Sequence, residues 1–178
     1  MAQPQGRLAL GFMSLVFRVR DLVRPPVEAL RQVGIRPGQT VLDFGCGPGG
    51  YSLAAARLVG PTGKVYALDV NPLAVGAVQR AAGKQHIENI TPVVADSAAD
   101  LPKESVDVVI LHDVLHLLAD PAGVIASLHR GLKQEGLLCV NDHHMKEAAI
   151  VSAISSGGLF EVSRDVDGTY CFRPAERS

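Results

Sequence analysis

Short apolar runs alternate along this chain with segments rich in helix-forming residues, and this alternation limits the fold more than any other feature. Strand-like runs occupy residues 40–44, 65–70, 90–96, 105–114 and 136–142. Two of the intervening helices have clear start signals, because Asn71-Pro72 and Asp120-Pro121 each place a capping side chain before a proline at the first helical position. Five strand–helix units at this spacing predict a parallel, doubly wound sheet.

The last part of the chain departs from this alternation. After a predicted helix around residues 145–156, the strand-like runs "LFEVSRDV" and "TYCFRP" flank Asp167-Gly168. An Asp-Gly pair between two such runs is a strong hairpin signal, and strands joined by a two-residue turn must be antiparallel. We therefore expect an α/β fold with a doubly wound, mostly parallel, seven-stranded Rossmann-like sheet that ends with one reversed strand from a C-terminal hairpin.

The length of 178 residues suffices for one well-filled core and is too small for two ordinary domains. We expect a single domain over 1–178, with an N-terminal helical segment at 1–36 and a core at 37–174. The N-terminal segment mixes apolar residues with arginines, and its candidates for a lid over a ligand are Phe12, Met13 and Phe17. A helix packed on the sheet with solvated arginines, or one that touches a membrane surface, would explain the same pattern.

Charge and cysteine content exclude several classes of protein. Lys and Arg number 17 against 18 Asp and Glu, so no overall field attracts nucleic acid. Three cysteines without a C-x-x-C pair argue against a disulfide scaffold or zinc ribbon and indicate a reducing compartment. The apolar run at 8–17 is far shorter than the roughly 20 residues that span a bilayer. We expect a cytoplasmic protein with no nucleic-acid partner and no stable membrane insertion.

The segment "VLDFGCGPGG" at 41–50 ends in a glycine loop, which begins at Gly45, and the segment fits two ligand-binding patterns. Gly45, Gly47 and Gly50 satisfy the dinucleotide pattern G-x-G-x-x-G, whereas Asp43 and the alternate glycines satisfy D-x-G-x-G-x-G. A dinucleotide would lay its pyrophosphate on this turn, where the carboxylate of Asp43 repels it. S-adenosylmethionine has no phosphate and carries positive charge, so it avoids that repulsion. The reversed last strand also disfavours an NAD(P)-dependent reductase.

Carboxylates lie at or near the ends of the predicted strands, where ligands bind in an open α/β sheet. Asp69 follows Gly49 by 20 residues, about the interval expected for a carboxylate that binds ribose hydroxyls. Asp96 ends the third strand-like run and could accept a hydrogen bond from an adenine amine. These positions agree with an adenosine-containing ligand.

From about Pro37 to Pro174 the chain resembles class I S-adenosylmethionine-dependent methyltransferases, close to the small ubiquinone/menaquinone-biosynthesis-like branch. The segments that carry the likeness are "VLDFGCGPGGYS", "VYALDVNP", "VVADSAADLP", "VDVVILHDVLHLL" and "LKQEGLLCVND". The resemblance implies S-adenosyl-L-methionine as the cofactor and S-adenosyl-L-homocysteine as its product. It implies backbone contacts from the loop to the methionyl part, Val70 near adenine and Ser97 at the adenine edge. The implied donor-binding residues are Asp43, Gly45, Cys46, Gly47, Gly49, Tyr51, Asp69, Val70, Asp96, Ser97 and His112.

Four of the six histidines follow two predicted strands, in "LHDVLH" and "NDHHMK". A positioned base helps methyl transfer to a protonated group, because the proton must leave the acceptor. One interpretation therefore takes His116 or His143 as the general base, with Asp142 orienting the imidazole. Another takes these side chains as helix caps and backbone partners, so that catalysis rests on proximity alone.

A third interpretation of the histidine cluster is a divalent metal site, as in catechol-type O-methyltransferases. Those enzymes place an acid after the fourth strand and an Asp-Asn pair after the fifth. Here the corresponding residues are His112 followed by Asp113, and the reversed pair Asn141-Asp142. These departures disfavour metal use, so no resident metal is expected.

The expected function is transfer of a methyl group from S-adenosylmethionine to a small-molecule acceptor by in-line displacement. The alternative from another class is a protein of the same fold that binds the donor without turnover, as a sensor or partner subunit. A homodimer is one option for the assembly.

Overall fold

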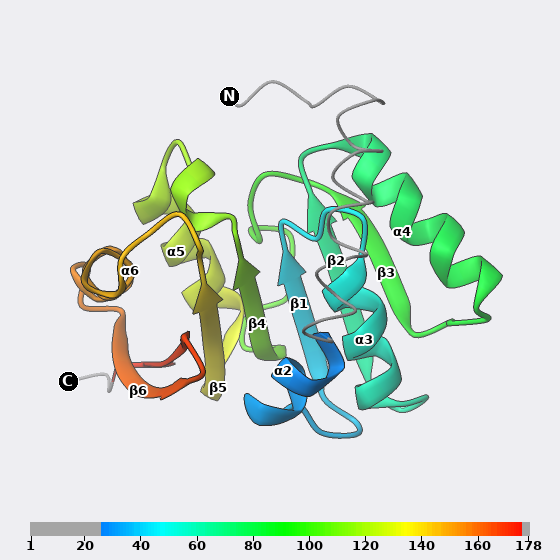
Figure 1. Ribbon diagram of the computed structural model, residues 1–178, viewed down its shortest axis with the longest axis horizontal. Coiled ribbons are helices and arrows are strands. Elements are labelled where there is room, and N and C mark those ends of the chain that lie inside the picture. Colours follow the sequence, from blue (N-terminus) through cyan, green and yellow to red (C-terminus); the bar gives the residue numbers. More distant parts are fainter. Residues whose placement is uncertain (1–25, 176–178) are drawn as a thin grey trace. The chain divides into compact units, whose positions relative to one another are not determined.

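The computed structural model describes residues 26–175 (Figure 1). These residues form two compact units. The first unit extends to Asp96, and the second begins at Ser97. The predicted lid residues Phe12, Met13 and Phe17 lie outside the described residues. The assignment of a single domain with an N-terminal lid stays a prediction.

The first unit contains three parallel strands in the order β3-β2-β1. They are β1 (Thr40–Phe44), β2 (Lys64–Asp69) and β3 (Ile90–Val94). The helices are α2 (Pro26–Gln32), α3 (Gly50–Val59) and α4 (Pro72–Lys84). Helix α3 packs on β1 and β2, α4 packs on β2 and β3, and α2 packs on α3 (Figure 1).

Local signals explain where the helices of the first unit begin and end. Asn71 accepts a hydrogen bond from the Leu73 amide at 3.0 Å, with Pro72 at the first helical position, as the sequence predicts. At the C-terminal end of α3, the Asn89 side chain donates to the carbonyls of Ala56 and Gly60, at 2.8 and 2.7 Å. The segment before β3 thus satisfies carbonyls that a helix terminus leaves unpaired.

The second unit contains four strands in the order β4-β5-β7-β6. They are β4 (Val106–His112), β5 (Leu132–Asn141), β6 (Phe160–Val166) and β7 (Thr169–Pro174). Its helices are the short 3-10 helix η1 (Leu115–Leu117), α5 (Pro121–Gly131) and α6 (Glu147–Ser155). Strands β4 and β5 are parallel, whereas β7 is antiparallel to both β5 and β6.

The predicted hairpin is confirmed, because β6 and β7 are joined by Asp167-Gly168. Both residues have left-handed backbone, with φ of 49° and 79°, as a type I′ turn requires. The reversed strand is β7, and β6 lies beyond it at the edge of the second unit's strand order. The fold class is confirmed as a doubly wound, mostly parallel, seven-stranded Rossmann-like fold with antiparallel C-terminal strands.

The boundaries of three strands differ by two residues or more from those expected. Strand β3 ends at Val94 and β4 covers only Val106–His112, so both are shorter than their apolar runs. Strand β5 starts at Leu132, four residues earlier than expected, and its register with β4 shifts between Val106 and Val108. A Lys133–Asp107 ion pair of 2.7 Å joins the two strands at this irregularity.

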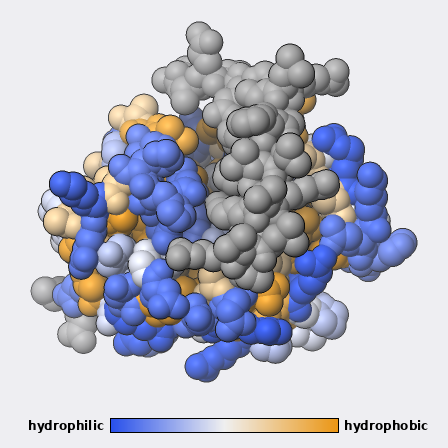
Figure 2. Space-filling view, viewed as in Figure 1, coloured by the Kyte–Doolittle hydropathy of each residue, from blue (hydrophilic) through white to orange (hydrophobic). Residues whose placement is uncertain are grey.

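The surface of the described residues is mixed. On the coloured part of the face seen in Figure 2, hydrophilic residues predominate and apolar ones form separate small patches. In the described part of the chain, no helix has the length and apolar character needed to cross a bilayer.

Candidate functional site

The glycine loop follows β1 and turns into α3. Gly45, Gly47 and Gly49 have positive φ angles of 77°, 50° and 94°, a backbone region that residues with a side chain rarely adopt. Gly49 is required for a second reason, because a Cβ atom there would lie 2.8 Å from Cγ2 of Val78 on α4. The glycines thus allow the sharp turn and the close approach of α3 to α4.

Hydrogen bonds attach the loop to the end of β2. The amides of Gly45 and Cys46 both donate to the Leu68 carbonyl, at 2.7 and 2.9 Å. The Gly47 amide donates to Oδ2 of Asp69 at 2.9 Å. These three amides are therefore engaged within the protein, and a bound methionyl group would meet other atoms of the same residues. Their predicted contact with the donor stays a prediction.

Asp69 holds the loop and keeps capacity for a ligand. Its Oδ1 accepts from the Asn71 amide at 2.8 Å, while Oδ2 accepts from Gly47. An ionised carboxylate offers about four acceptor positions, so the two backbone bonds leave room for further donors. The two hydroxyls of a ribose match that remaining capacity, and the predicted ribose contact fits this carboxylate.

Two exposed valines lie at the ends of adjacent strands. The Val70 and Val94 residues are 52% and 53% exposed, although both are large and apolar. Val70 directly follows β2, and Val94 pairs in register with Asp69. Val94 was not among the sequence-predicted site residues; the available signal was an apolar residue at the end of the third strand. An adenine ring would cover such apolar surface at this edge.

Asp43 is buried two residues before the loop, at 3% exposure. It accepts a hydrogen bond from the Ser52 hydroxyl on α3. Burial raises the pKa of Asp43 to about 6, against the lowering effect of the Ser52 hydrogen bond and with a further rise from the nearby Asp69 charge. At neutral pH the group is mostly ionised, so negative charge remains beneath the loop. This agrees with the argument against a pyrophosphate ligand.

The other predicted donor-site residues of the first unit take ordinary positions. Tyr51 is half-buried in the first turn of α3, and Asp96 is exposed after β3. Cys46 is buried against Ala67 and Val78, and burial raises the pKa of its thiol. Cys46 is therefore a packing residue, as expected for a small apolar side chain within a loop.

In the second unit, the loops after β4 and β5 leave the sheet side by side. His112, the last residue of β4, is in register with Asn141, the last residue of β5. The Asp113 amide then donates to the Asn141 carbonyl at 2.8 Å. The predicted polar segments 112–116 and 141–144 are therefore neighbours, as their places after parallel strands suggest.

Each of the two loops provides a carboxylate that contacts a histidine of the other loop. Asp142, from the loop after β5, accepts through Oδ2 from the backbone amide of His116 at 3.1 Å and contacts Nδ1 of the same residue at 2.8 Å. Asp113, from the loop after β4, accepts through Oδ1 from the His143 amide at 3.0 Å and contacts His143 Nδ1 at 2.9 Å. Each histidine is thus held by its backbone and its ring to one carboxylate oxygen.

This arrangement fixes the tautomer of both rings. A carboxylate only accepts hydrogen bonds, so Nδ1 of His116 and of His143 carries the hydrogen. In the neutral ring Nε2 then has the lone pair and can accept a proton. From the sequence, Asp142 is expected to orient either His116 or His143; in the structure it contacts His116, and His143 has a different partner, Asp113. The catalytic roles of His116, His143 and Asp142 stay predictions.

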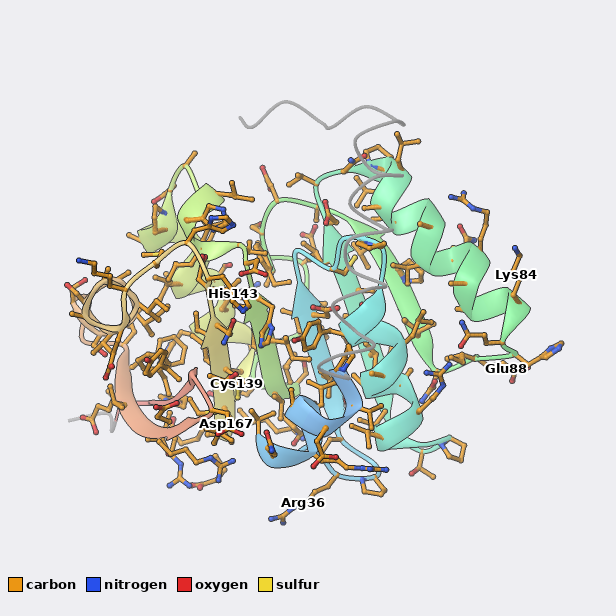
Figure 3. All side chains as sticks on the ribbon, viewed as in Figure 1. Arg36, Lys84, Glu88, Cys139, His143 and Asp167 are labelled. Atoms are coloured by element: carbon orange, nitrogen blue, oxygen red, sulfur yellow. The ribbon has the colours of Figure 1, made fainter. Side chains whose placement is uncertain are left out.

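The two pairs differ in exposure. The Asp142 side chain is fully buried and that of His116 is 24% exposed, whereas the Asp113 and His143 side chains are 20% and 57% exposed. Partial burial acts to raise the pKa of Asp113. Hydrogen bonds from the amide and the ring of His143, together with the electrostatic effect of His143 and His112, outweigh burial and hold this pKa below its ordinary value. Figure 3 shows His143 beside the carboxyl end of β5.

The remaining polar residues of the second unit support the loops. The His144 ring contacts the His116 ring, with centroids 4.3 Å apart and planes tilted by 43°, and the His144 amide donates to Oδ1 of Asp142 at 3.0 Å. Ser97 accepts weakly from the Ala99 amide, and His112 is half-buried. Within residues 26–175, no three or more His, Cys, Asp or Glu side chains are grouped so that they could hold a metal ion.

Comparisons with known proteins show the family of the chain. A family model described as a methyltransferase domain matches residues 35–165. A ribosomal protein L11 methyltransferase from Chloroflexus aurantiacus is 30% identical over 159 residues, covering 76% of this chain and 48% of that protein. A ubiquinone/menaquinone biosynthesis C-methyltransferase from a Marinomonas species is 30% identical over 130 residues, covering 71% of this chain and 51% of that protein. The chain spans about half the length of these curated relatives.

A solved structure shows the same relationship in three dimensions. The crystal structure of an S-adenosylmethionine-dependent methyltransferase from Aquifex aeolicus superposes with a TM-score of 0.73 at 28% identity, covering 83% of this chain and 86% of that chain. The family match extends over well more than half of the present chain. The chain therefore belongs to the methyltransferase domain family, of the class I type whose cofactor is S-adenosylmethionine.

Proposed function

We propose that this protein transfers a methyl group from S-adenosylmethionine to a small molecule and that His116 is the general base. The observation that carries the proposal is the His116–Asp142 pair, in which a fully buried carboxylate contacts Nδ1 at 2.8 Å. A donor-binding protein without turnover has no need of an imidazole oriented in this way.

The donor is held by residues of the first unit. The positive-φ glycines form the turn, Asp69 offers its remaining acceptor positions to the ribose, and Val70 covers the base. Asp43 supplies the negative charge that favours a positively charged nucleoside over a diphosphate. When bound, S-adenosylmethionine supplies a methyl group already activated by its sulfonium, so the protein must orient the acceptor and exclude water.

The acceptor proton passes to Nε2 of His116. Asp142 keeps the hydrogen on Nδ1 and stabilises the imidazolium that forms, which is the function of the carboxylate in other acid–base pairs. The amides of His116 and His144 also donate to Asp142, so the carboxylate is fixed before the reaction. The tilted ring of His144, whose centroid is 4.3 Å from that of His116, restricts the movement of the His116 ring.

The test compares donor binding with turnover. Wild-type protein, His116→Gln and Asp142→Asn are incubated with tritiated donor and a panel of phenols, amines and thiols. We expect the two variants to bind S-adenosylhomocysteine with wild-type affinity, measured by calorimetry. Their methyl-transfer rate should fall by a factor of about 10² or more, the usual contribution of a general base. His86→Asn, at an exposed histidine outside the cluster, serves as the control.

Two outcomes would contradict the proposal. Full activity of His116→Gln would exclude His116 as the base while leaving methyl transfer intact. Tight binding of S-adenosylmethionine without turnover of any acceptor in the panel would favour a sensor or partner subunit.

A further inference from the structure

Two of the three cysteines face each other across neighbouring strands. Cys139 on β5 and Cys171 on β7 are direct partners in the antiparallel register, and their Sγ atoms are 3.0 Å apart. Both residues are buried and both thiols are free. Figure 3 shows Cys139 among the strands of the second unit. Neither cysteine belongs to the proposed donor site or to the Asp–His pairs, so this contact is independent of the proposed function.

The two strands hold the thiols at a spacing from which a disulfide can close. Directly opposed residues of an antiparallel pair have Cα atoms about 4.5–5.5 Å apart, within the range of roughly 4.4–6.8 Å found across disulfides. The two sulfur atoms must approach each other by about 1 Å to reach the S–S bond length of about 2.05 Å. Rotation about the side-chain bonds can supply most of that approach, so the strands need little displacement.

The surroundings make the two thiols unequal. The hydrogen bond between the sulfur atoms lowers the pKa of Cys171 and raises the pKa of Cys139, so Cys139 is the donor and Cys171 the acceptor. Burial opposes ionisation of Cys171, whereas Arg164, its register partner on β6, favours the thiolate through a hydrogen bond and its positive charge. The nearby Asp165 charge acts in the opposite direction. A thiolate is the nucleophile in thiol oxidation, so Cys171 is the sulfur that reacts first.

The edge of the second unit gives a small oxidant a route to Cys171. Strand β6 is the last in the strand order, and its residues from Glu161 to Asp165 are exposed. The register between β6 and β7 shifts between Val162 and Arg164, directly beside Cys171. Such an irregularity disrupts the ladder locally, and segments of this kind open more readily than core strands. Local opening of β6 therefore exposes Cys171 without unfolding β5.

We propose that Cys139 and Cys171 are a redox modification site, at which hydrogen peroxide converts the two thiols to a reversible disulfide between β5 and β7. The Cys171 thiolate attacks one peroxide oxygen, the O–O bond breaks, and the leaving hydroxide takes up a proton to become water. The Cys139 sulfur then attacks the Cys171 sulfenic acid, so that the S–S bond forms, the S–O bond breaks and a second water leaves with the Cys139 proton. Two thiols and one peroxide thus give one disulfide and two waters. A thiol reductant such as glutathione reverses the reaction.

The disulfide closes a long segment of the chain. It joins positions 32 residues apart, and the enclosed segment contains Asp142, α6 and β6. A cross-link removes conformational freedom from the unfolded chain, and more of it for a longer segment. The oxidised protein should therefore have a Tm roughly 5–15 °C above that of the reduced protein.

Peptide mapping of the full chain tests the site. Folded, reduced protein is treated with hydrogen peroxide, quenched with catalase, alkylated in urea and digested for mass spectrometry. We expect the Cys139 and Cys171 peptides to be linked and Cys46, whose thiol pKa is raised by burial, to stay free. Dithiothreitol should restore all three thiols. Free Cys139 and Cys171 after this treatment, or a bond that forms only when peroxide is added in urea, would overturn the proposal.

Variants identify the attacking thiol. In Cys139→Ala the sulfenic acid has no partner, so dimedone, which traps sulfenic acids, should label Cys171. Labelling of Cys139 in Cys171→Ala should be roughly tenfold lower. Arg164→Gln should slow disulfide formation by roughly three- to tenfold, because less of Cys171 is thiolate. Arg80→Gln, at an exposed arginine on α4, is the matched control and should keep the wild-type rate.

Thermal unfolding completes the test. Peroxide should raise the Tm of the wild type and leave the Tm of Cys171→Ala unchanged, because this variant cannot form the bond. An equal rise in both proteins would show that peroxide acts elsewhere and would overturn the proposal, as would equal dimedone labelling of the two cysteines. None of these measurements uses methyl transfer, so their outcome is separate from that of the proposed function.

Discussion

Asp43 is 3% exposed, two residues before the glycine loop, and the Ser52 hydroxyl donates to it. Burial raises its pKa from 3.8 to about 6. The folded protein therefore holds this proton more tightly than the unfolded chain does. The stability contributed by the protonated form is fully present below pH 3.8 and is lost as the pH rises to about 6.

Substitution of Asp43 by asparagine should remove this pH dependence. Between pH 4 and pH 6.5, the free energy of unfolding of the wild type should fall by about 2 kcal/mol relative to Asp43→Asn. Urea unfolding at a series of pH values measures the difference between the two slopes. Asp100→Asn, at an exposed carboxylate, is the control and should keep the wild-type slope. Parallel curves for wild type and Asp43→Asn would contradict the burial argument.

Single residues also show how much of the candidate site can be predicted from the sequence. The pattern D-x-G-x-G-x-G predicts where Asp43 stands and which sign of charge it brings, because both follow from residue type and spacing. It does not predict burial or the Ser52 hydrogen bond, because these depend on how α3 packs. In the same way, the sequence indicates that Asp142 orients a histidine but not which one. The choice of His116 depends on contacts between loops 26 residues apart.

At the scale of helices and strands, local signals predict the elements well. Asn71 and Asp120 mark the starts of α4 and α5 through hydrogen bonds within three residues, and Asp167-Gly168 marks the hairpin through two backbone angles. The early start of β5 at Leu132 is different. It depends on pairing with Val106 across a shifted register, a long-range contact that no local pattern encodes.

The junction of the glycine loop with α3 provides a test at this scale. Gly49→Ala would force a side chain into left-handed backbone and place its Cβ 2.8 Å from Cγ2 of Val78. Strain and overpacking together should lower the free energy of unfolding by about 2–4 kcal/mol. Urea unfolding measures the loss, and calorimetry with S-adenosylhomocysteine should show weaker binding because the loop is displaced.

Gly83→Ala is the matched control for this substitution. Gly83 lies within α4, where a new Cβ would meet no atom within 4 Å and the backbone needs no positive φ. Alanine there should raise the free energy of unfolding by about 0.5–1 kcal/mol through its better helix propensity. If Gly49→Ala behaved like Gly83→Ala, the close approach of α3 to α4 would not limit position 49.

At the scale of the whole molecule, the predicted functions divide between the two units. Most predicted donor-site residues belong to the first unit, from Asp43 to Asp96, whereas the oriented histidines belong to the second. The first unit contains the glycine turn and Asp69. The second unit contains the two Asp–His pairs that connect the loops after β4 and β5. Donor and acceptor should therefore protect different segments of the chain.

Hydrogen exchange measured by mass spectrometry on the full chain tests this division. S-adenosylhomocysteine should slow exchange at residues 43–53 and 69–73, because a bound nucleoside stabilises the loop and the Asp69 hydrogen bonds against local opening. A phenol added to that complex should slow exchange at 113–117 and 142–145, because the proposed acceptor position lies at His116. NAD at the same concentration is the control and should leave 43–53 unprotected, because its diphosphate meets the Asp43 charge. Protection of the glycine loop by NAD but not by S-adenosylhomocysteine would refute the electrostatic basis of donor selection.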